Sequence, residues 1–294
     1  MRRFVRAAVF VVALGSTSAA IGAHPASAQP APRLHDHMPR GSALVSAAPA
    51  HLTWWGGRVV RSVRVVQVVW GTGRFAAGVS ASSAPNVGSF YSGIVRSPFI
   101  DWLREYNTKI DAIGRGSFAG KYIITPSSRN NGAHLDDVKN IRTELAAQIR
   151  AHHLPSPDDN TVYALFFRSG QIVTQGGMDS ATGFCAYHNT APWNSLAKLR
   201  YMVLPATASS SHCGPTPGFG NLTSAASHEL LETITDPDVG LATRLAAPLS
   251  WYDPMRGEVA DICQGYTAIV RAGDGRNYVV QKAWSNRRNA CVAA

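Results

Sequence analysis

Apolar residues follow two different periods along this chain, and these periods predict an alternation of strands and helices. Largely apolar runs with β-branched residues at 63–70 and 161–167 are typical of buried strands. Over 135–152 the apolar residues instead recur at helical spacing, and Pro98 suits the first turn of a helix over 98–106. Four shorter segments are also interpreted as strands: 121–125, 184–188, 200–204 and 278–284.

A third helix is predicted over 223–235, where Thr223 or Ser224 can cap the first turn and Pro237 ends the helix. Strands that alternate with helices predict an α/β or α+β fold, in which a mixed central sheet forms the middle of three layers. No internal repeat or linker interrupts the chain after residue 52, so we expect one globular domain over 52–294.

The first 51 residues lack both periods. Three arginines within the first six residues precede a short apolar run, and small residues then lead to Ala26-Ser27-Ala28. These are the parts of a cleavable secretory signal, which we expect over 1–28. Residues 29–51 are rich in Pro, Ala, Ser and His and predict a disordered leader. No later segment is long and apolar enough for a transmembrane helix, so we expect a secreted, extracellular or periplasmic protein.

Charge and cysteine content narrow the class of protein. The net charge is +10, but the chain has no run of Lys and Arg and no basic stretch interleaved with aromatics, so nucleic acid is not an expected partner. An even number of cysteines in an exported chain predicts two disulfides. Four cysteines allow three connectivities, and we favour pairing of neighbours because it closes the shorter loops. The cysteines are Cys185, Cys213, Cys263 and Cys291.

The segment from His228 to Glu232, His-Glu-Leu-Leu-Glu, carries the candidate chemistry. On a helix, residues i and i+4 lie on one face, so His228 and Glu232 can hold one metal ion together. Glu229 then lies beside that ion, where it can take a proton from water. This is the arrangement of zincin-like hydrolases with H-E-x-x-H, except that Glu replaces the second His, and zinc accepts carboxylate ligands. The alternative is an ordinary polar helix face.

Further acidic and imidazole groups can complete such a site. Glu258 is the candidate third ligand, and Asp261 can orient His228 by a hydrogen bond. His188 is a further candidate ligand, although a single histidine can equally be a hydrogen-bonded core residue. Zinc is the expected ion, and calcium is the alternative because carboxylate ligands suit a harder cation.

Six motifs occur in a fixed order along the chain: Trp55-Gly56-Gly57 with 66–71 and Phe75, 97–106, Cys185–His188, His228–Glu232 with Pro237, Trp251-Tyr252 with 258–263, and 278–285 with Ala290-Cys291. This ordered set resembles the EXORDIUM, or phosphate-induced, protein family of plant cell walls and its bacterial relatives, except that Ala186 stands where the family has Gly. The resemblance covers about 52–294 and implies an extracellular protein linked to growth responses, in a family with no settled biochemical activity.

The sequence therefore predicts a secreted, metal-dependent hydrolase, with a peptidase as the leading interpretation. Glu229 is the expected general base, and His228, Glu232 and Glu258 are the expected ligands. The alternative is a non-catalytic extracellular protein that binds cell-wall polysaccharide or a surface partner, with the acidic cluster serving as a structural calcium site. Stoichiometric zinc favours the first interpretation, whereas calcium or no metal favours the second.

Export is expected to remove residues 1–28, because the small-residue step Ala26-Ser27-Ala28 follows the apolar run. N-terminal sequencing of the protein from culture supernatant should begin at Gln29. A mature chain that still begins at Met1 contradicts the prediction.

Overall fold

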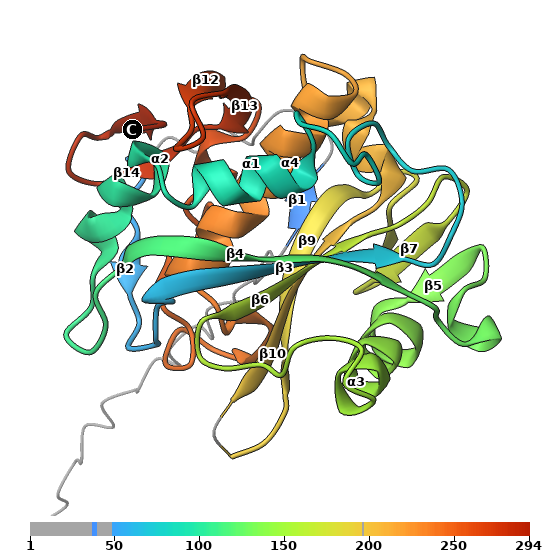
Figure 1. Cartoon of the computed structure of the whole chain (residues 1–294). Helices are drawn as coiled ribbons and strands as arrows, with labels where there is room; N and C mark the ends of the chain where they lie inside the picture. The colour runs from blue at the N-terminus through green and yellow to red at the C-terminus, as the bar shows by residue number, and fades with distance from the viewer. Residues whose placement is uncertain (1–36, 40–48, 196) are drawn as a thin grey trace, which may run out of the picture. The chain divides into compact units, whose positions relative to one another are not determined.

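The computed structural model describes residues 37–39, 49–195 and 197–294, so the predicted signal segment and most of the predicted leader lie outside the described residues. The described chain is built on a six-stranded sheet with the order β1-β9-β10-β6-β3-β4 (Figure 1). These strands are β1 His37–Pro39, β3 Ser62–Trp70, β4 Gly114–Ile124, β6 Thr161–Phe166, β9 Phe184–Pro192 and β10 Lys198–Leu204.

The sheet is mixed, as predicted. β4, β3, β6 and β10 are parallel neighbours, whereas β9 runs antiparallel to β10 and β1 runs antiparallel to β9. Parallel strands need crossover connections, and α1, α2 and α3 lie in these connections, whereas α4 follows the strand β10. Helix bounds are α1 Val87–Ile94, α2 Pro98–Asp101, α3 Thr143–Arg150 and α4 Phe219–Thr235, with η1 Trp102–Tyr106 after α2 and the π-helical turn η3 Asp137–Arg142 before α3.

Both faces of the sheet are covered, which explains why the strand segments are largely apolar. α1 and α4 lie on one face and α3 lies on the other (Figure 1). Along β3, Val65 and Val69 enter the core beneath α1 and α4, while Val66 and Val68 enter the core beneath α3. Alternate residues of a strand point to opposite faces, so a strand buried on both faces has no polar period.

α4 is buried along almost its entire length, because every residue from Asn221 to Thr235 is buried. The sheet covers one side of it, and the hairpin of β12 and β13 packs against it as well. Smaller elements complete the described chain: β2 Thr53–Trp54, η2 Ser128–Asn130, β5 His134–Asp136, β7 Ile172–Gln175, β8 Met178–Asp179, η4 Ala206–Ser209, η5 Ser211–Cys213, η6 Val239–Leu241, β11 Trp251–Tyr252, η7 Asp261–Cys263, β12 Thr267–Arg271, β13 Asn277–Gln281, β14 Ala283–Ser285 and β15 Ala290–Val292.

Two predicted helix starts are wrong. α4 begins at Phe219, and Thr223 lies inside it, where its hydroxyl donates to the Val279 carbonyl oxygen at 2.7 Å instead of capping. Leu135 lies in β5, and the backbone becomes helical only from Asp137, because the Asp136 side chain caps that turn by accepting from the Lys139 N–H. Tertiary contacts therefore overrode the apolar spacing at both points.

Part of the predicted disordered leader forms a strand. His37–Pro39 is β1, which pairs with the outer edge of β9. An edge strand presents unpaired N–H and carbonyl groups, and these pair with a short extended segment even when its side chains offer no apolar period. The helix α1 was not predicted either, and its signal is a capping box in which the side chains of Asn86 and Ser89 bind each other's backbone N–H.

The predicted disulfides are confirmed. Cys185 is bonded to Cys213 and Cys263 to Cys291, each across 28 residues. Among the residues that the structure describes, no helix is both long and apolar enough to cross a membrane. The two disulfides fit an extracellular protein.

Replacing both Cys263 and Cys291 by serine should lower the free energy of unfolding by about 3 kcal/mol, because the bond restrains a long loop of the unfolded chain. Denaturant titration of oxidised wild type and the double variant measures the difference. The same titration under reducing conditions should bring wild type toward the variant. A loss under about 0.5 kcal/mol would show that this bond adds little to the fold.

Candidate metal centre

α4 brings three of the predicted residues into one buried cluster. His228 and Glu232 are one helical turn apart, and His228 Nε2 lies 3.1 Å from Glu232 Oε2. The other oxygen of Glu232, Oε1, accepts from the backbone N–H groups of Ala260 and Asp261 at 3.2 and 3.1 Å. Because Oε1 is held in this way, Oε2 is the oxygen directed at the imidazole.

β9 brings His188 to the same cluster. His188 pairs with Met202 of β10, and both side chains lie on the face of the sheet that α4 covers. His188 Nδ1 lies 3.2 Å from Glu229 Oε2 and 3.7 Å from Glu232 Oε2. Glu229, which lies between His228 and Glu232 on α4, therefore also points into the cluster.

The loop after β11 supplies two more carboxylates. Glu258 Oε1 lies 3.5 Å from His188 Nε2, and Asp261 Oδ1 lies 3.6 Å from His228 Nε2. The second oxygen of Asp261 accepts from the Glu258 N–H at 3.0 Å, which fixes the turn between them. We define the metal-site cluster as His188, His228, Glu229, Glu232, Glu258 and Asp261.

Glu258 and Asp261 contact different histidines of the cluster. Donor atoms of His228, Glu232 and Asp261 lie within 4.8 Å of one another, and so do those of His188, Glu229 and Glu232. Asp261 is thus the third group beside His228 and Glu232, whereas Glu258 contacts His188. The sequence indicated both Glu258 and Asp261 as candidates, but it could not show which carboxylate oxygen the backbone of the turn would direct toward His228.

The metal-site cluster is closed to solvent, since five of its side chains are fully buried and that of Asp261 is 8% exposed. Several of its polar atoms make no hydrogen bond within the described part of the chain: both ring nitrogens of His228, Oε2 of Glu232 and Oδ1 of Asp261. Buried polar atoms are normally hydrogen-bonded, so these atoms point to a missing partner. Nitrogen and carboxylate oxygen are donors that zinc and related divalent cations accept.

Charges within the cluster perturb its titration. Burial acts to lower the pKa of His228, but the nearby negative charges of Glu232 and Asp261 outweigh it and raise that pKa to about 9. Burial, followed by the charge of Glu232, raises the pKa of Asp261 well above its usual range. Without a cation, His228 and Asp261 therefore stay protonated at pH values where an ordinary imidazole and an ordinary carboxyl group have lost their protons.

Comparison of the chain with models of protein families, with curated proteins and with solved structures gave no match.

Zinc binding at near-neutral pH should release protons, because His228 with a pKa of about 9 is protonated there and a metal ligand must be neutral. The apparent affinity should consequently fall as the pH is lowered. Calorimetric titration in two buffers with different heats of ionisation measures the released protons. Equal heats in both buffers would contradict the expected exchange of protons for metal.

Proposed function

We propose that this protein is an exported metal-dependent hydrolase that cleaves peptide bonds at the metal-site cluster. The observation that supports this most directly is the convergence of Glu229 on the same buried cluster as His228, Glu232 and Asp261. A cation-binding helix face alone would not require the intervening acid to turn inward. In this proposal the cluster contains both the residues that would bind the ion and the residue that would transfer protons.

His228, Glu232 and Asp261 are the residues that would hold the ion. Within the described part of the chain, their buried atoms that lack hydrogen-bond partners include an imidazole nitrogen of His228 and one carboxylate oxygen each of Glu232 and Asp261, which fits a divalent cation such as zinc. Such an ion supplies Lewis-acid chemistry, lowering the pKa of water and polarising a carbonyl group. Glu258 is then free of the ligand role expected from the sequence and serves as the partner of His188.

Glu229 is the general base in this proposal. Its carboxylate takes a proton from the attacking water and passes it to the leaving amine, so that it ends the cycle unprotonated. His188, 3.2 Å from Glu229 Oε2, holds that carboxylate in place, and Glu258 holds the other ring nitrogen of His188 at 3.5 Å. The role of His188 is therefore to position the base.

A second candidate function is favoured by the complete burial of the cluster. Catalytic metal sites keep an open position, whereas structural sites are closed. In this alternative the cation, with calcium as a candidate, joins α4, β9 and the loop of Glu258 and Asp261 in a non-catalytic protein. Such a protein binds cell-wall polysaccharide or a surface partner elsewhere on its surface.

We also propose that the chain is a bacterial-type member of the EXORDIUM family. The ordered set of six motifs supports this, and three of those motifs contain residues of the cluster: the motif that ends at His188, the motif that begins at His228, and the motif that spans 258–263. Membership supports an extracellular location and leaves the reaction to be decided at the cluster.

Glu229→Gln is expected to keep the metal and abolish hydrolysis, because Gln has nearly the same shape but cannot accept a proton; turnover should fall by roughly 10²–10⁴-fold. His228→Ala should lose both properties, since two carboxylates hold zinc poorly. Metal content and cleavage of a broad peptide library are measured on the same preparations. Glu105→Gln, which changes a glutamate outside the cluster, is the matched control.

The outcomes separate the two candidate functions. Wild type that binds stoichiometric metal but cleaves no peptide supports the closed, non-catalytic site. Wild type that binds no metal and cleaves nothing refutes the hydrolase. Full activity in Glu229→Gln would leave a hydrolase in which Glu229 is not the base.

A further inference from the structure

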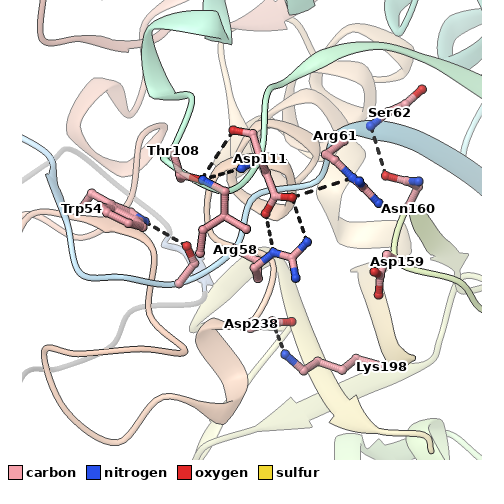
Figure 2. Close-up of polar contacts among 12 residues, drawn as sticks. Trp54, Arg58, Arg61, Ser62, Thr108, Asp111, Asp159, Asn160, Lys198 and Asp238 are labelled. Carbon is pink, nitrogen blue, oxygen red and sulfur yellow. Dashed lines mark hydrogen bonds and ion pairs between the residues drawn. The ribbon is translucent and has the colours of Figure 1, made fainter. Parts of the chain in front are cut away.

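Three neighbouring parallel strands begin beside one pocket of about 240 Å³. Arg58 and Arg61 precede β3, Asp159 precedes β6, and Lys198 and Arg200 lie at the start of β10. All five residues line the pocket, and none belongs to the metal-site cluster. Figure 2 shows four of them with the buried acids Asp111 and Asp238.

The buried carboxylates of Asp111 and Asp238 form ion pairs with the cationic side chains that line the pocket. Arg58 donates through Nε and Nη2 to the two oxygens of Asp111, with Nη2 at 2.8 Å from Oδ1, and Arg61 Nε lies 3.7 Å from Oδ1 (Figure 2). Lys198 pairs with Asp238, and Arg200 Nε donates to Asp238 Oδ1 at 3.0 Å. Both acids are buried, with exposed side-chain fractions of 0% and 1%.

The cations keep donor groups for a ligand. The side chains of Arg58, Arg61 and Lys198 are 44%, 53% and 36% exposed, although each of them contacts a buried acid. Arg58 uses Nε and Nη2 on Asp111, which leaves Nη1 for a ligand. Because the acids already hold these side chains, binding would immobilise fewer of them and so cost less entropy.

The charges in and behind the pocket do not cancel. Four cationic side chains face three carboxylates, those of Asp111, Asp159 and Asp238, so one positive charge remains. A single negative charge on a ligand balances it. Arginine forks match the two oxygens of a carboxylate, which favours that group among monoanions.

Asp159 restricts the ligand further. Asp159 lines the same pocket as Arg58 and Arg61, so it adds a negative charge to the wall of the pocket. A carboxylate there repels a dianion but accepts hydrogen bonds from hydroxyl groups beside the acid. From these observations we propose that the pocket binds the carboxylate of a hydroxylated acid, the chemistry of a hexuronic sugar.

Calorimetric titration with galacturonate tests the proposal, with galactose as the uncharged control. We expect saturable galacturonate binding with a Kd of about 1 mM and no binding of galactose. Arg61→Ala should weaken galacturonate binding by about tenfold, whereas Arg104→Ala, which removes an exposed arginine paired with Asp101, should leave it unchanged. Arg61→Lys should restore only part of the affinity, because lysine lacks the fork.

Asp159→Asn provides a second test that does not depend on the arginines. It should weaken galacturonate relative to acetate and allow sulfate to bind, because it replaces two charged acceptor oxygens by one neutral amide oxygen and so removes one negative charge. No saturable galacturonate binding, or equal affinity in Arg61→Ala, overturns the proposal. Stronger binding of N-acetylalanine than of galacturonate would replace the sugar acid by a peptide carboxylate. None of these outcomes bears on the metal-site cluster, since the two sites share no residue.

Discussion

The burial of four carboxylates and two imidazoles in one cluster is the constraint on which much of this structure depends. Even with both imidazoles protonated, ionised carboxylates would leave the cluster with a net charge of two minus. A charge that is removed from water without a partner is costly, so such a cluster must retain protons or hold a cation. The raised pKa values of His228 and Asp261 correspond to the state that retains protons. The atoms of His228, Glu232 and Asp261 that lack hydrogen-bond partners among the described residues suit the state that holds a cation.

The fold brings the cluster together from three segments and fixes each of them. α4 is buried along its length and carries His228, Glu229 and Glu232. The disulfide of Cys185 joins β9, three residues before His188, to the turn that precedes α4. The disulfide of Cys263 joins the loop of Asp261 to β15. Covalent links therefore flank two of the three segments, and the third is held by the sheet and the hairpin around it.

Much of the scaffold could be predicted from the sequence because its signals are local. The β-branched runs of β3 and β6 mark strands that are buried on both faces, and the alternation of strands with helices indicates a mixed sheet. The start of α4 could not be predicted, because Thr223 bonds to Val279 across the fold rather than to its own helix. The strand β1 escaped prediction because its pairing depends on the free edge of β9.

The candidate site was predicted in its composition more than in its arrangement. Helical spacing placed His228, Glu229 and Glu232 together, since i and i+4 lie on one face whatever the surroundings. The exchange of Glu258 for Asp261 beside His228 depends on two backbone N–H groups that hold Glu232 Oε1, and on the turn in which Asp261 accepts from Glu258. The pocket lined by Arg58, Arg61, Lys198 and Arg200 was not predicted, because its residues are scattered between positions 58 and 200 and meet only where β3, β6 and β10 begin.

A crystal structure of the mature protein, purified without chelator, with anomalous diffraction data above and below the zinc edge tests the central claim most directly. The account predicts an anomalous peak, present only above the zinc edge, among His228 Nε2, Glu232 Oε2 and Asp261 Oδ1, the buried atoms that lack hydrogen-bond partners in the described part of the chain. A peak seen at both energies would identify a different ion at the same place, such as a lighter transition metal or calcium. Well-ordered side chains with water or nothing among these three atoms, in crystals grown with added zinc and calcium, would contradict the account.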